Sequence, residues 1–141
     1  MVSELSRNKF EHRLKRIVRE LIHARGYIGV WEQLWPTTEK IARVENRYRS
    51  FFGFTRMALN QQFFLSLAKV IEQRKKNENL SIWRLLTAIE NEPNLLSSPL
   101  DLDCLKRTLT ERQELLKRII DYRDKELAHI DDRYYLCIVL N

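Results

Sequence analysis

The chain has 141 residues, of which 44% are hydrophobic and 31% are charged. This length predicts one domain spanning residues 1–141, and this composition excludes an intrinsically disordered chain. The 25 Lys and Arg residues outnumber the 19 Asp and Glu residues, which gives a net charge of +6 and suits an anionic partner.

Other classes of protein are disfavoured by what the sequence lacks. Three Gly and three Pro leave little material for the many turns of an all-β fold. No apolar run approaches the roughly 18 residues of a membrane-spanning helix, and the first ten residues lack the apolar stretch of a signal peptide. We therefore expect a soluble, cytoplasmic protein without membrane association.

The first predicted helix covers roughly residues 10–35. Its apolar residues alternate between four- and three-residue steps, which places them on one face. They are Phe10, Leu14, Ile17, Leu21, Ala24, Ile28, Trp31 and Trp35. Gly26 and Gly29 weaken this helix and are candidates for a kink, and Pro36 ends it because the residue before a proline disfavours helical geometry.

Two helical segments follow. Thr37 is a candidate N-cap for the first, TTEKIARVENRYRS. The second, residues 51–73, is apolar around most of its circumference, which predicts a helix inside a bundle. Residues 74–79, RKKNEN, form a polar connection.

The second half predicts two more helices. Ser81 caps a short helix that ends before Pro93, and Asp101 or Asp103 begins a long helix with Leu and Ile at three- and four-residue steps. The last segment, YYLCIVLN, has no helical period. The sequence therefore predicts an all-α bundle of four main helices plus short ones.

Most catalytic motifs are absent. The sequence has no glycine-rich phosphate loop, no HExxH and no Gly-x-Ser-x-Gly. None of the three histidines has a second His or Cys at metal-ligand spacing, so we expect no metal and no cofactor. Cys104 and Cys137 lack a neighbouring base, and we expect them to be buried thiols without a disulfide.

The stretch YRDKELAHID, residues 122–131, holds the strongest candidate site. A guanidinium such as that of Arg123 stays charged and binds phosphate through a planar fork of donors, and an imidazole such as that of His129 exchanges a proton near neutral pH. The two groups suffice for metal-independent cleavage of a phosphodiester. Asp124 would orient them, and Lys125 would add positive charge.

Spacing alone does not single out this pair. An Arg followed by a His after four to six intervening residues occurs three times in a chain with 16 arginines. On a straight α-helix, six residues advance about 9 Å and turn about 240°, so Arg123 and His129 would lie about 120° apart. Either the helix breaks near Asp124 or a second chain completes the site. Asp132 could orient the imidazole.

Three segments in order carry a family resemblance: residues 31–73, then LSIWRLLTAIE, then YRDKELAHID. They resemble the HEPN superfamily, and most closely its branch associated with abortive infection by phage. The superfamily motif is an Arg, a polar residue, and a His after four to six intervening residues on the late core helices. Arg123, Asp124 and His129 match it, whereas Arg7 and His12 match the letters on the wrong helix.

The resemblance implies a four-helix up-and-down bundle that dimerises, so that two motifs form one composite cleft. Active members are metal-independent endoribonucleases, often toxins or phage-defence effectors, and many are neutralised by an antitoxin such as a minimal nucleotidyltransferase. Other members are inactive binding modules. Some toxins carry a tyrosine two residues after the histidine for modification by the antitoxin; here that position is Asp131, and Tyr134 and Tyr135 are the nearest tyrosines.

We therefore predict a HEPN endoribonuclease in which His129 moves protons and Arg123 clamps phosphate. Residues 1–75 carry most of the excess positive charge, and arginines there would attract RNA: Arg47 and Arg49 first, with Arg13, Arg16 and Arg56. The alternative is a non-catalytic HEPN module that binds RNA, nucleotide or a partner protein. A helical DNA-binding protein is a third possibility, but the sequence has no helix-turn-helix pattern.

Overall fold

The computed structural model describes residues 4–73, 81–96 and 100–127, and within these ranges every regular element is helical. This confirms the predicted all-α class. The first half contains α1 (Glu4–Gln33), α2 (Glu39–Arg47) and α3 (Arg49–Ile71). The second half contains α4 (Ile82–Asn91), the 3₁₀ turn η2 (Pro93–Leu95), α5 (Leu102–Glu111), α6 (Gln113–Tyr122) and the π-helical turn η3 (Arg123–Leu127).

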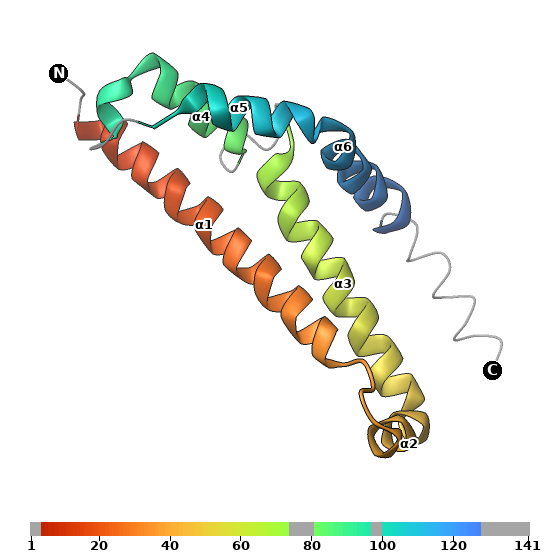
Figure 1. The fold of residues 1–141 in the computed structure, drawn as a ribbon. Coiled ribbons are helices and arrows are strands. Elements are labelled where there is room, and N and C mark those ends of the chain that lie inside the picture. The colour runs from red at the N-terminus through yellow and green to blue at the C-terminus, as the bar shows by residue number, and fades with distance from the viewer. Residues whose placement is uncertain (1–3, 74–80, 97–99, 128–141) are drawn as a thin grey trace.

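The two long helices, α1 and α3, run antiparallel along each other, and α2 forms the corner between them (Figure 1). The short helix α4 packs against both at the other end, and α6 with η3 lies against the last turns of α3. The bundle therefore consists of the long helices α1 and α3 with α4 and α6 packed against them. The predicted motif lies beside the end of α3.

The apolar core lies where the start of α1 meets the end of α3, α4 and η2. Its buried members are Phe10, Ile17, Val70, Leu85, Ile89 and Leu95. The end of α3 that faces the motif is therefore also the end that the core holds in place.

Only part of the apolar stripe on α1 is covered within the described chain. Phe10, Ile17 and Ala24, spaced seven residues apart, are buried, whereas Leu14 and Leu21 between them are exposed. A seven-residue repeat keeps one edge of the stripe facing α3, and the other edge faces outward. The helix continues as one element through both of its glycines.

The prediction that residues 51–73 lie inside the bundle holds only for the last turns of α3. Ser66, Ala68 and Val70 are buried there, but Phe51 and Phe54 near the start of the helix are 64% and 56% exposed. An apolar circumference indicates a helix that can be covered on all sides. It does not reveal which neighbouring element covers each side.

Local signals for helix ends need two corrections. Thr38, not Thr37, caps α2, because its hydroxyl accepts a hydrogen bond from the Ile41 N–H at 3.3 Å. Asp101 caps α5 as predicted, accepting from the Cys104 N–H at 2.8 Å. The predicted last long helix is instead divided at Arg112 into α5 and α6, at the step that the apolar series skips.

Two further expectations concern single residues. Cys104 lies on the outer side of α5 and is exposed, so the expectation of a buried thiol is wrong for this residue, and Cys137 lies outside the described residues. Ser81 is the N-cap residue of α4, but its side chain makes no capping hydrogen bond.

Arg56 holds the corner of the molecule together. Its Nη1 donates to a Glu45 carboxylate oxygen at 2.5 Å and to the Leu34 carbonyl at 3.1 Å, and its guanidinium lies 4.6 Å from the centre of the Trp35 ring. These contacts join the end of α1, α2 and α3. Arg56, expected to attract RNA, is thus a structural residue.

Candidate functional site

Tyr122 fixes the end of α6 against α3. Its ring packs on Phe64, with 4.5 Å between the ring centres, and its hydroxyl accepts from the Asn60 amide nitrogen at 3.4 Å. At the next residue the chain widens into the π-helical turn η3. Such turns are rare and are found frequently at functional sites.

Arg123, the first residue of this turn, forms a bidentate ion pair with Glu72 at the end of α3. Nη1 donates to one carboxylate oxygen at 2.7 Å, and Nη2 donates to the other at 3.0 Å. The Glu72 side chain is only 5% exposed. A carboxylate this deeply buried requires a charged partner, so the pair fixes both side chains.

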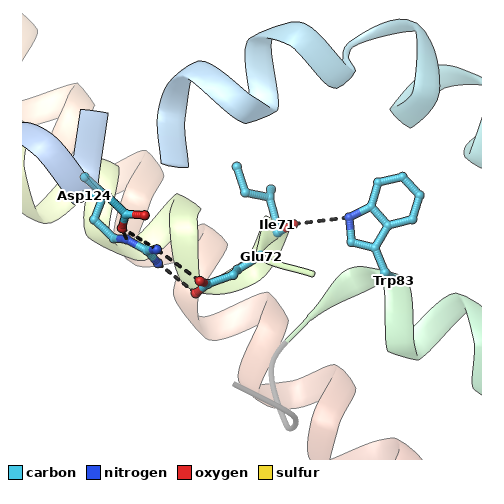
Figure 2. A network of polar contacts seen from close by, with 5 residues as sticks. Ile71, Glu72, Trp83 and Asp124 are labelled. Carbon is cyan, nitrogen blue, oxygen red and sulfur yellow. Dashed lines mark hydrogen bonds and ion pairs between the residues drawn. The ribbon is translucent and has the colours of Figure 1, made fainter. Parts of the chain in front are cut away.

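Asp124 holds the same guanidinium on a second edge. Its Oδ1 accepts from Nε at 2.9 Å and from Nη2 at 2.7 Å, and its side chain is 36% exposed. Figure 2 shows the Glu72 and Asp124 carboxylates converging on this network. The hydrogen bonds that Arg123 donates to Glu72 are the main cause that raises the pKa of Arg123, against an opposing effect of burial. Arg123 therefore stays charged wherever the protein is folded.

A cavity of about 480 Å³ opens beside this network, between the end of α3, the start of α4, and α6. Glu72 lines the cavity as well as binding Arg123. Trp83 also lines it, and its indole N–H donates to the Ile71 carbonyl at 3.2 Å, so the ring is tied to the end of α3 (Figure 2).

Glu72 and Trp83 were not predicted from the sequence. One signal for Glu72 was present: it directly follows α3, one helical turn after Ala68, which is fully buried. A buried acid at the end of a helix needs a cation from another element. The identity of that cation, 51 residues away, depends on the tertiary fold.

The other predicted site residues are dispersed. Lys125 is exposed within η3. Arg47 and Arg49 flank the start of α3, which has 23 residues, so about 35 Å of helix separates them from the Glu72 end. Within one chain the structure does not bring these two arginines to Arg123.

The family of the chain follows from a comparison with protein-family models. The HEPN_AbiU2 model, described as AbiU2, matches residues 7–137. The chain belongs to the AbiU2 family of HEPN proteins. Neither the comparison with curated proteins nor that with solved structures gave a match. The predicted membership of an abortive-infection-associated HEPN family is therefore confirmed.

The AbiU2 match includes the whole motif, but only its first part lies in the described structure. His129, and with it Asp131 and Asp132, lies outside the described residues. A composite cleft with His129 thus stays a prediction. The helical geometry does change at Arg123, where α6 gives way to the π-helical turn.

The described residues of this HEPN domain hold no group of three or more His, Cys, Asp or Glu side chains that could bind a metal ion. No helix among them is long and apolar enough to cross a membrane.

Proposed function

We propose that this HEPN domain is a metal-independent endoribonuclease of phage defence, acting in the cytoplasm as a toxin or effector. RNA would be cut at a site shared between two copies of the chain. The observation that supports this proposal is the fixed and permanently charged Arg123, held by a buried carboxylate at the family motif. A guanidinium fixed in this way is suited to stabilise charge on a phosphate.

A phosphodiester would bind Arg123 by replacing Asp124. The Nε and Nη2 donors that Asp124 occupies form one edge of the guanidinium, and this edge can grip two phosphate oxygens. Asp124 is partly exposed and can turn into water, whereas Glu72 is buried and stays in place. A phosphodiester carries one negative charge, as the Asp124 carboxylate does, so the guanidinium keeps two anionic partners after the exchange.

His129 would move the protons of the reaction. The ribose 2′-oxygen attacks phosphorus while its proton passes to an imidazole, and the bond from phosphorus to the 5′-oxygen breaks. The leaving 5′-oxygen takes up a proton from an imidazolium. The products are a 2′,3′-cyclic phosphate and a 5′-hydroxyl. A homodimer would supply two imidazoles and two guanidiniums, and a cognate antitoxin, nucleotidyltransferase-like or of another kind, would restrain the activity.

One observation favours a second function. Two carboxylates already surround Arg123, which is also what a purely structural arginine requires. In that case the domain is a non-catalytic HEPN module, and it binds RNA, nucleotide or a partner protein without cutting RNA.

Cleavage assays separate these two functions. We expect the wild-type chain to cut a mixed-sequence RNA in the presence of EDTA, leaving cyclic-phosphate ends. His129→Ala and Arg123→Ala should each lower the rate by at least about 100-fold, because each removes a group that acts in the transition state. The matched control is Arg118→Ala, which removes an exposed charge from α6.

Two results would refute the nuclease proposal. One is an intact RNA substrate after incubation with the wild-type chain. The other is cleavage that survives equally in His129→Ala, which would point to a contaminating nuclease.

A further inference from the structure

The cavity beside Arg123 has a composition that suits one part of an RNA chain. Its lining includes the Trp83 indole and aliphatic side chains of α3 and α6, and also the charged side chains of α6, here called its rim: Glu114, Lys117 and Asp121. A volume of about 480 Å³ lies within the range of small-molecule sites and exceeds what a single nucleoside needs.

The cavity and the proposed phosphate clamp share a wall. Glu72 lines the cavity, and its two carboxylate oxygens hold Arg123, which is not itself a lining residue. A group bound in the cavity would therefore be separated by the Glu72 side chain from Arg123 and a phosphate on it. In RNA, the group adjacent to a phosphate is a nucleoside.

Trp83 can supply the stacking surface. Its ring is half-buried and is oriented by the hydrogen bond from its indole N–H to the Ile71 carbonyl. Proteins that recognise unpaired RNA stack bases on aromatic side chains and read the exposed base edges by hydrogen bonds. An indole held in one orientation loses little freedom when a base stacks on it.

The charge of the rim identifies the kind of base. Glu114 and Asp121 outnumber Lys117, so the rim disfavours phosphate and offers acceptors. Carboxylates accept hydrogen bonds from exocyclic amino groups of bases. Guanine presents an N1–H and an amino group side by side and can engage one carboxylate twice. Uracil presents a single N–H between two carbonyls, which the carboxylates would repel.

We infer that this cavity binds a guanine base of the RNA substrate, next to the phosphate on Arg123. This inference rests on the proposed ribonuclease function and adds a base preference to it. A partner protein's arginine is another group that acids and an indole can hold. The base is favoured because the cavity adjoins a phosphate-type clamp and is larger than one side chain fills.

Nucleotide binding tests the inference apart from catalysis. The His129→Ala chain is titrated with guanosine 5′-monophosphate and uridine 5′-monophosphate, which carry the same phosphate, and followed by calorimetry. We expect guanosine monophosphate to bind about ten-fold more tightly, as one well-placed pair of hydrogen bonds provides. Asp121→Asn should reduce this ratio to below about three-fold, whereas Glu111→Gln, an exposed acid of α5 outside the cavity, should preserve it.

A pair of tryptophan variants tests the stacking surface. Trp83→Leu should weaken both nucleotides about ten-fold, and Trp83→Phe, which keeps an aromatic face, should stay within about three-fold of the parent chain. Circular dichroism checks that both variants fold. If Trp83→Leu does not fold, Asp121→Asn still decides the inference.

The results distinguish this inference from the nuclease proposal. Equal binding of the two nucleotides overturns the inference, and RNA cleavage by the wild-type chain would still support the nuclease. Guanosine preference without any cleavage supports the base site and refutes the nuclease. An arginine amide that binds where neither nucleotide does would show that the cavity receives a protein partner, which also overturns the inference.

Discussion

Arg123 is held by two carboxylates with different roles at the residue scale. Glu72 is buried and comes from another helix, whereas Asp124 is its neighbour in sequence and partly exposed. A buried charge has no access to water, so breaking the pair with Glu72 is costly. An exposed carboxylate exchanges its partner for water at little cost.

This difference predicts that two amide variants destabilise the protein by different amounts. Glu72→Gln should lower the free energy of unfolding by roughly 2–4 kcal/mol, and Asp124→Asn by less than about 1 kcal/mol. Asp124→Asn should also bind an uncleavable 2′-O-methyl RNA several-fold more tightly, because a weaker acceptor competes with the phosphate. Urea denaturation and fluorescence anisotropy measure the two quantities.

The matched control for Glu72 removes both charges. The double variant Glu72→Leu with Arg123→Met should recover most of the stability that Glu72→Gln loses, since it leaves no unpaired buried charge. Equal destabilisation by Glu72→Gln and Asp124→Asn would contradict the distinction between the two carboxylates.

The sequence could identify Arg123 and Asp124 but not Glu72. The first two belong to one short motif, and a motif is a local property of the chain. Glu72 reaches Arg123 across 51 residues, and helical periodicity reveals only that its position is buried, not which cation faces it. Trp83 lines the cavity for the same kind of reason, because α4 packs at the end of α3.

At the element scale, periodicity predicted the helices more reliably than their surroundings. The apolar steps of α1 and the nearly continuous apolar character of α3 were enough to predict two long helices. They did not predict that Leu14 and Leu21 would be exposed, or that Phe51 would lie outside the core. Periodicity shows which face is apolar, and tertiary packing decides how much of it is covered.

The glycines of α1 have no packing role within the described chain. A Cβ built at Gly26 or Gly29 meets no atom within 4 Å, and neither residue has a positive φ. Gly26→Ala and Gly29→Ala should therefore each raise the free energy of unfolding by roughly 0.5–1 kcal/mol, because alanine has less freedom to lose in a helix. Urea denaturation measures the change.

Gly26→Pro is the opposite control, and it should cost about 3 kcal/mol or more by removing a helical hydrogen bond. A fall in stability for Gly29→Ala would be informative. It would show that another surface approaches α1 closely at that residue.

At the scale of the whole molecule, we expect a second chain to complete the site and to cover part of the exposed surface. Leu14, Val18 and Leu21 expose apolar surface along α1, and such surface commonly marks an interface. Arg47 and Arg49 lie too far from Arg123 to join its site within one chain. In the proposed dimer, arginines of one copy would guide RNA toward the motif of the other.

We predict that the chain is a dimer at micromolar concentration and that its site is shared. Analytical ultracentrifugation should give about twice the monomer mass. Mixing the inactive Arg123→Ala and His129→Ala chains should restore part of the RNA cleavage, because each mixed dimer keeps one intact arginine and one intact histidine. A mixture that stays inactive, or a monomeric wild type, would contradict a shared site.

The corner at α2 and the apolar core lie at opposite ends of the long helices (Figure 1). The corner depends on the polar contacts of one arginine, Arg56, whereas the core end buries a cluster of large apolar side chains. Local opening is cheapest where few apolar contacts hold an element. We therefore expect local opening to be easier at the corner than at the end that carries Arg123 and Glu72. In the proposed dimer, Arg123 and Glu72 would then already hold their positions before the second chain binds.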